Sequence, residues 1–123
     1  MLKPQRILIV DDDLSICDVL QELLIPMGYD VIVSEGTEDI ERLVAEENPD
    51  LIVLDYLLPF INGGDLCNQL KKNKKYAKIP VIIYSAYPKV MMSLGDYSFD
   101  AFIAKPFDLN EMVRNVEILL AKK

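Results

Sequence analysis

The sequence contains no histidine, no tryptophan and only two cysteines among its 123 residues. The absence of histidine excludes a Ser-His-Asp or Cys-His catalytic centre, a histidine-ligated zinc ion, and phosphorylation of the chain on an imidazole of its own. The two cysteines, Cys17 and Cys67, lie in apolar-periodic stretches without CxxC spacing. This spacing favours buried thiols in a reducing, cytoplasmic setting over a zinc or redox site.

Long hydrophobic runs are also missing. The apolar run at residues 7–10 is too short for the core of a signal peptide, and no run approaches the roughly 18 residues of a membrane helix. The net charge of −7 opposes direct binding to nucleic acid or to anionic membranes. With 51% hydrophobic residues, the chain is expected to form a single globular domain over residues 1–123, without an output domain.

Short β-branched apolar segments alternate with helical patterns along the chain. Strands are expected at residues 7–10, 51–54, 81–84 and 101–104, with a weaker one at residues 31–33. Helical spacing of apolar residues follows the strands at residues 7–10, 31–33, 51–54 and 101–104, and a short fourth helix is expected within residues 88–100. Because the strands are apolar without alternation, both faces of the sheet should be covered. The pattern predicts a three-layer α/β fold with a parallel sheet, whose ligands bind at the carboxyl ends of the strands.

Polar side chains follow four of these strands: Asp11 and Asp12 after the first, Asp55 after residues 51–54, then Ser85 and Lys105. Two carboxylates about 5 Å apart repel by roughly 3 kcal/mol at an effective dielectric near 20, so this cluster needs a cation or a raised pKa. An oxygen-only cluster favours Mg²⁺, with Mn²⁺ as a substitute. Ser85 and Lys105 can bind phosphate oxygens on the other side. The sequence therefore predicts a site that holds a phosphoryl group against an aspartate.

Four runs, ILIVDDD, LIVLDYLLPFINGG, VIIYSA and AFIAKPF, occur in this order over nearly the whole chain. In combination they resemble the receiver domain of two-component response regulators, of the kind found in chemotaxis regulators. The resemblance implies a flavodoxin-like (βα)5 fold with strand order 2-1-3-4-5. It also implies that the first and last helices cover one face of the sheet and that the second to fourth helices cover the other.

The resemblance further implies roles for single residues, with Asp55 as the phosphoacceptor. The implied metal-binding groups are Asp11 (through water), Asp12, Asp55 and the Leu57 carbonyl. The implied phosphoryl-binding groups are Ser85, the Ala86 amide and Lys105. The Lys105-Pro106 bond would be cis, which an X-Pro bond allows.

The resemblance implies that the phosphoryl donor is a sensor histidine kinase or a histidine phosphotransfer protein, and because the chain lacks histidine, the phosphohistidine must belong to another molecule. The resemblance implies a switch in which Ser85 moves toward the phosphoryl group and the Phe102 ring moves inward, although Phe102 could also be a plain core aromatic. The readout face would comprise the fourth helix, fifth strand and fifth helix, and would bind a downstream protein or a second copy of the chain. Leu57 and Tyr87 would flank the hydrolytic water, and their bulk should slow dephosphorylation.

Two alternatives stay open. Asp11-x-Asp13-x-Ser15 after an apolar strand matches the nucleophile motif of haloacid-dehalogenase-like phosphatases. Such an enzyme would use Asp11 as its nucleophile and would turn over small phosphate esters repeatedly, whereas a receiver domain is a signalling domain that assists its own phosphorylation and dephosphorylation. The second alternative is an interaction module with the receiver fold that is never phosphorylated and does not bind Mg²⁺.

Overall fold

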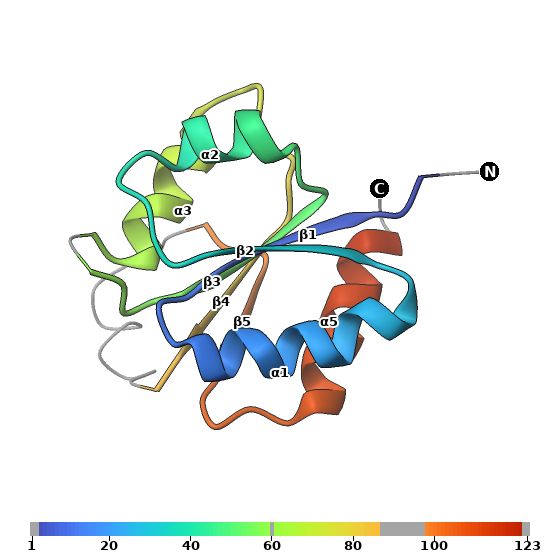
Figure 1. Ribbon diagram of the computed structural model, residues 1–123. Coiled ribbons are helices and arrows are strands. Elements are labelled where there is room, and N and C mark those ends of the chain that lie inside the picture. Colours follow the sequence, from blue (N-terminus) through green and yellow to red (C-terminus); the bar gives the residue numbers. More distant parts are fainter. Residues whose placement is uncertain (1–2, 60, 87–97, 122–123) are drawn as a thin grey trace.

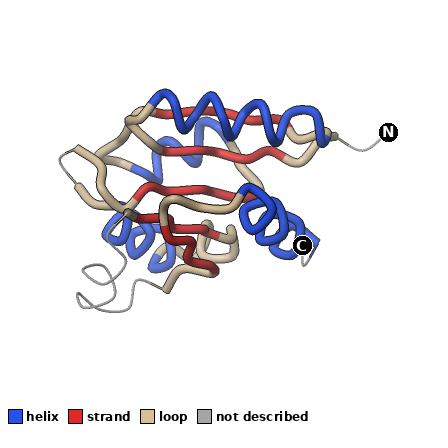
Figure 2. Tube along the Cα trace, turned by 90° about the horizontal axis from the view of Figure 1, so that it is seen from below, coloured by secondary structure: helices blue, strands red, loops and turns tan. Residues whose placement is uncertain are grey.

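Five short strands form one parallel sheet at the centre of the computed structural model, which describes residues 3–59, 61–86 and 98–121 (Figure 1). In chain order the strands are β1 (Arg6–Val10), β2 (Asp30–Ser34), β3 (Leu51–Asp55), β4 (Val81–Ser85) and β5 (Ala101–Ala104). Their spatial order is β2-β1-β3-β4-β5, and every neighbouring pair is parallel. Figure 2 shows the strands running side by side. The predicted order is confirmed, and β1 and β3 are the strands at which the chain direction across the sheet reverses.

Helices cover both faces of this sheet. α1 (Leu14–Leu24) and α5 (Leu109–Ala121) lie on one face, and α2 (Ile40–Glu47) and α3 (Gly63–Lys72) lie on the other (Figure 1). This arrangement agrees with the predicted layers for these four helices. The fourth helix expected within residues 88–100 lies outside the described residues, apart from residues 98–100, which are not helical.

Capping residues mark the ends of the first two helices. The Asp13 side chain accepts a hydrogen bond from the Ser15 amide and caps α1. A short 3-10 turn, Ile25–Met27, follows α1 and ends at Gly28, whose φ of +97° is in the left-handed region. Asn48 closes α2 in the same region with φ of +51°.

Alternation along each strand divides the core into two clusters. Ile82 and Tyr84 of β4 face the layer of α1 and α5, whereas Val81 and Ile83 face the layer of α2 and α3.

The two native thiols are divided in the same way, with Cys17 on α1 and Cys67 on α3, and both are buried as predicted. Burial raises the pKa of the Cys17 thiol to about 11, and nearby carboxylates add to this shift. Its Sγ donates to the carbonyl oxygen of Asp11 at 3.4 Å.

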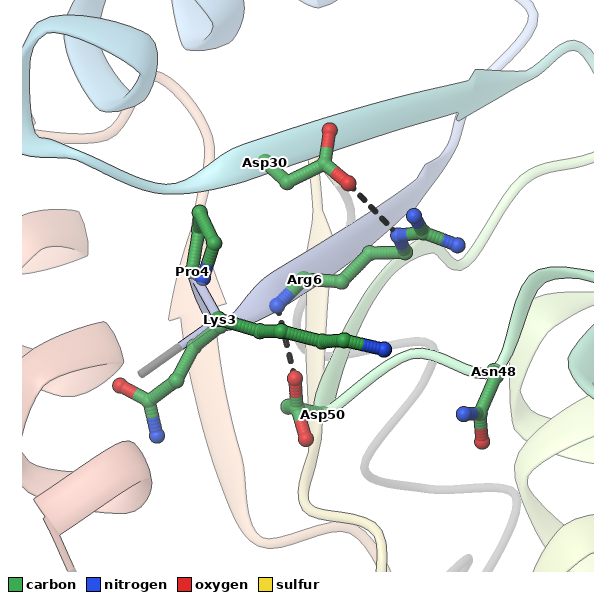
Figure 3. A pocket seen from close by; sticks show the side chains of 7 residues that line it. Lys3, Pro4, Arg6, Asp30, Asn48 and Asp50 are labelled. Atoms are coloured by element: carbon green, nitrogen blue, oxygen red, sulfur yellow. Dashed lines mark hydrogen bonds and ion pairs between the residues drawn. The ribbon is translucent and has the colours of Figure 1, made fainter. Parts of the chain in front are cut away.

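Arg6 binds groups of three segments at the amino end of the sheet, and Figure 3 shows two of these contacts. The predicted site lies at the opposite, carboxyl end of the strands. Its Nε lies 2.7 Å from Asp30 Oδ2 on β2, and its backbone amide donates to Asp50 Oδ2 at 2.7 Å. Its guanidinium also donates to the Glu47 carbonyl at the end of α2. Arg6, Asp30 and Asp50 line a pocket of about 450 Å³, but these side chains and amides bind one another, so they serve to join β1, β2 and the segment before β3.

Lys71 differs from the lysines that follow it. Five lysines fall within residues 71–78, and the other four are exposed. The Lys71 side chain is only 15% exposed, and its ammonium donates to the carbonyls of Ala77 and Ile79 and to Asp100 Oδ2. Asp100 Oδ2 also accepts the Val81 amide. Lys71 thus ties the end of α3 to the starts of β4 and β5.

Within the described part of the chain, no helix is long and apolar enough to cross a membrane.

Candidate functional site

Three carboxylates meet at the carboxyl ends of β1 and β3. Asp11 and Asp12 follow β1, Asp55 ends β3, and each can offer one oxygen such that all three oxygens lie within 4.8 Å of one another. Asp11 and Asp55 are buried, and Asp12 is exposed. An all-oxygen donor set with one ligand open to solvent suits Mg²⁺, which keeps several of its waters. The site therefore fits the predicted metal.

Lys105 stands between two of these carboxylates. It follows β5, and its amide donates to the Ser85 carbonyl at 2.8 Å, which extends the β4–β5 pairing by one residue. Its Nζ lies 3.3 Å from Asp55 Oδ2 and 3.6 Å from Asp11 Oδ2. The Lys105-Pro106 peptide bond is cis, as predicted.

Burial is the main influence on the charge of Asp55. Burial, followed by repulsion from Asp11, raises the pKa of this carboxyl from 3.8 to about 6, and Lys105 and the Leu57 amide oppose the shift. The Leu57 amide donates to Asp55 Oδ1 at 3.3 Å. Lys105 therefore neutralises the cluster only in part, and a bound cation would favour the ionised, nucleophilic form of Asp55.

Asp11 is held on both oxygens. Its Oδ1 accepts the Asp13 amide at 2.8 Å, and its Oδ2 accepts a hydrogen bond from the hydroxyl of Tyr84. Burial and this hydrogen bond raise the pKa of Tyr84 far above its usual value. From the sequence, Tyr84 is predicted only as an apolar residue of the strand at residues 81–84. Tyr84 pairs with Asp55 of β3, and paired residues of adjacent strands point to the same face of the sheet. The strand register could therefore have indicated that the Tyr84 side chain lies near the site.

Gly63 brings the start of α3 against the backbone of Asp55. Its amide donates to the Tyr56 carbonyl at 2.8 Å, and a Cβ at position 63 would overlap the carbonyl oxygen of Asp55. The glycine is therefore needed for this close approach. The sequence run INGG contains Gly63, but only the fold shows which backbone it approaches.

The remaining predicted site residues take different positions. Ser85 is fully buried at the end of β4, Ala86 is exposed beside it, and Leu57 is 51% exposed in the segment that follows β3. Tyr87 lies outside the described residues. Phe102 on β5 is half-buried against the cluster under α2 and α3, with its ring centroid 6.0 Å from that of Phe99.

The motif of the phosphatase alternative serves a local purpose here. The Asp13 side chain caps α1 and is exposed, while the Asp11 oxygens accept hydrogen bonds from Asp13 and Tyr84. The DxDxS spacing is therefore explained by a buried strand-end carboxylate followed by an N-cap.

Comparison with known proteins answers the question of family. The profile of the response regulator receiver domain matches residues 7–117. The chain is 35% identical over 119 residues to the DNA-binding dual master transcriptional regulator RpaA of Synechocystis, covering 95% of this chain and 49% of that protein. It is 36% identical over 123 residues to the alkaline phosphatase synthesis transcriptional regulatory protein PhoP of Bacillus subtilis, covering 96% and 49%. The chain thus spans about half the length of the curated relatives it matches.

Solved structures agree. The response regulator protein TrrA of Thermotoga maritima, determined in complex with Mg²⁺ and BeF, is 30% identical with a TM-score of 0.82, covering 94% of this chain and 98% of that one. The receiver domain of a signal transduction histidine kinase from Syntrophus aciditrophicus is 31% identical with a TM-score of 0.86, covering 96% and 91%. With the family profile, the relatives and the acidic cluster in agreement, this chain belongs to the receiver domains of two-component response regulators, which are signalling domains and not classical enzymes.

Proposed function

We propose that Asp55 is the phosphoacceptor of this receiver domain and that a partner's phosphohistidine is the donor. A carboxylate oxygen of Asp55 attacks phosphorus, an O–P bond forms, the N–P bond breaks, and its electron pair leaves with the imidazole of the donor. The observation that carries the proposal is the buried Asp55 carboxylate beside Asp11 and Asp12, with the Lys105 ammonium 3.3 Å from its Oδ2.

The residues around Asp55 divide the remaining work. Asp12, Asp55 and the Leu57 carbonyl would hold Mg²⁺ directly, and Asp11 would hold it through water. When bound, Mg²⁺ supplies charge neutralisation on the transferring oxygens. Lys105 binds a phosphoryl oxygen from the opposite side, and the Ser85 hydroxyl and Ala86 amide bind the others. In this way the domain assists its own phosphorylation and its own dephosphorylation.

The donor protein is proposed to dock beside Lys105. An apolar groove of about 450 Å³ adjoins the site there, and its lining residues come from α1, from the segment between β5 and α5, and from Ala86 and Leu109. Val19 and Leu109 at its rim are both more than 40% exposed. An apolar helix surface that carries a phosphohistidine would bury these side chains and present phosphorus to Asp55.

Leu57 and Tyr87 are proposed to lengthen the lifetime of the phosphoryl group. Leu57 is 51% exposed and lies two residues after Asp55, where its bulk can obstruct an attacking water. We expect Leu57→Asn to shorten the half-life of the phosphorylated form several-fold in a chase that follows loss of the phosphoryl mass. A half-life of seconds in the wild type, unchanged by Tyr87→Ala, would contradict the proposal.

Phosphorylation is proposed to shift the domain between two packings through Ser85 and Phe102. Ser85 would be drawn toward the phosphoryl group, and the half-buried Phe102 ring would move inward. The face that includes β5 and α5 would then bind a downstream protein or a second copy of the chain.

Intact mass after incubation with acetyl phosphate tests the phosphoacceptor. We expect one phosphoryl adduct on the wild type that requires Mg²⁺, and none on Asp55→Asn. An adduct that survives Asp55→Asn would move the nucleophile to Asp11 and support the phosphatase alternative. An absence of any adduct, together with an absence of Mg²⁺ binding, would support the unphosphorylated interaction module.

A further inference from the structure

Tyr84 lies where three groups of the site meet. It is fully buried on β4, opposite Asp55 of β3 in the parallel register. Its hydroxyl donates to Asp11 Oδ2, and the Lys105 Nζ lies over its ring, 4.4 Å from the centroid. The edge of the ring packs against Phe107, with 5.8 Å between centroids and an interplanar angle of 87°. One side chain thus contacts both the acidic and the basic part of the site.

The Tyr84 hydroxyl and the Lys105 ammonium approach the same oxygen of Asp11. Asp11 is buried and accepts the Asp13 amide on Oδ1 and the Tyr84 hydroxyl on Oδ2. A buried carboxylate that lost one of these donors would draw in the nearest remaining donor, because an unsatisfied buried charge is costly. That donor is Lys105, now 3.6 Å away. With the hydroxyl in place, the ammonium stays slightly nearer to Asp55, at 3.3 Å.

The ring contributes a second restraint. An ammonium over the face of an aromatic ring is attracted by the ring quadrupole, and the attraction grows as water is excluded. The Lys105 side chain is 16% exposed, so this contact is largely shielded. Phe107 in turn fixes the orientation of the ring from its edge.

We propose that Tyr84 is a positioning residue of the phosphoacceptor site: its hydroxyl satisfies Asp11 and its ring supports Lys105, so that the ammonium is directed to Asp55 and to the group bound there. The inference rests on the proposed function, in which Lys105 binds a phosphoryl oxygen. Pre-organised charges of this kind lower the cost of reorganisation when the group is transferred.

Tyr84→Phe is the sharpest variant, because it removes the hydroxyl and keeps the ring. Tyr29→Phe is the matched control, since Tyr29 packs against the same core cluster but immediately precedes β2, at the other end of the sheet. Both variants are first compared with the wild type by thermal unfolding to show that they fold.

The first measurement needs no phosphorylation. In the metal-free wild type, the methylene protons next to the Lys105 ammonium should carry an upfield ring-current shift in the NMR spectrum. We expect Tyr84→Phe to change this shift as the ammonium moves toward Asp11, and Tyr29→Phe to leave it unchanged. A Lys105 signal that is identical in Tyr84→Phe and wild type overturns the inference, whether or not the wild type accepts a phosphoryl group.

The second measurement is the affinity for beryllofluoride, a phosphoryl mimic, in saturating Mg²⁺. We expect about a tenfold loss in Tyr84→Phe, the size of one hydrogen bond to a charged group, and no change in Tyr29→Phe. The loss should disappear when Tyr84→Phe is made in a Lys105→Met background and compared with Lys105→Met alone, because Tyr84 acts through the ammonium. A loss of equal size in the Lys105→Met background would indicate a general structural effect and would refute the positioning role. A wild type that binds beryllofluoride but accepts no phosphoryl group from acetyl phosphate would contradict the proposed function alone.

Discussion

The ionised carboxyl of Asp55 should destabilise the metal-free protein at neutral pH. Folding raises its pKa from 3.8 to about 6, so between these values the folded state binds more protons than the unfolded state. Stability should therefore fall as the pH rises through this window. At about 1.4 kcal/mol per pKa unit, the ionised group costs the fold about 3 kcal/mol above pH 6.

Asp55→Asn removes this charge and keeps a side-chain oxygen that can accept the Leu57 amide. We expect the free energy of unfolding to rise at pH 7.5 by about 2 kcal/mol, or about 8 °C in Tm. The gain is smaller than the full cost because the new amide group faces the Lys105 ammonium. Near pH 4 the difference from the wild type should vanish, since Asp55 is then protonated in the folded protein.

Urea unfolding followed by circular dichroism, in EDTA and at several pH values, measures this difference. Asp18→Asn on the exposed side of α1 is the control and should change stability little at any pH. Mg²⁺ at one hundred times its Kd should stabilise the wild type by about 2.7 kcal/mol and Asp55→Asn by much less. An Asp55→Asn variant that is no more stable than wild type at pH 7.5, or equally stabilised at pH 4, would refute the electrostatic reasoning.

Three further predictions concern stability and metal binding. Lys71→Met should lower the free energy of unfolding in urea by about 2 kcal/mol, because it leaves two carbonyls and a carboxylate without their shared donor. Its control, Arg42→Met, breaks only an exposed pair with Glu46 and should cost less than about 0.5 kcal/mol. Gly63→Ala should cost about 3 kcal/mol in the same assay by overlap with the Asp55 carbonyl, and a smaller loss would show that α3 can shift. Asp12→Ala should weaken Mg²⁺ binding about tenfold or more in calorimetry. Because Asp12 is exposed, the free energy of unfolding in urea should stay nearly unchanged. An unaltered affinity for Mg²⁺ would exclude Asp12 as a ligand.

The fold was predictable because its strands are apolar without interruption. Such strands are covered on both faces, and this single property implies the parallel sheet and the layers of helices. The acidic cluster was predictable for a related reason, since Asp11 and Asp55 are charges that follow directly on buried strands. In β3 and β4 the strands run one residue further than expected, to Asp55 and Ser85, because ladder pairing continues past the last apolar side chain.

Other features depend on contacts that a sequence pattern does not contain. In the sequence Tyr84 is one more apolar strand residue. Its hydroxyl contacts Asp11 only because β3 lies between β1 and β4 in the sheet, an order that the sequence pattern alone does not contain. Lys71 looked like one of several solvated lysines, but its acceptors are two carbonyls beyond the end of α3 and the carboxylate of Asp100. In both cases one partner, Asp11 or Asp100, is distant in the chain, so local periodicity gives no signal.

The burial of both native thiols makes this protein convenient for chemical labelling. Cys17 and Cys67 are the only cysteines in the sequence, and both lie inside the two core clusters. A cysteine introduced at the exposed Ser15, on the rim of the groove beside Lys105, would therefore react with maleimide probes far faster than either native thiol. A photo-crosslinker attached there would test the proposed docking surface for a phosphohistidine donor without any need to remove the native cysteines.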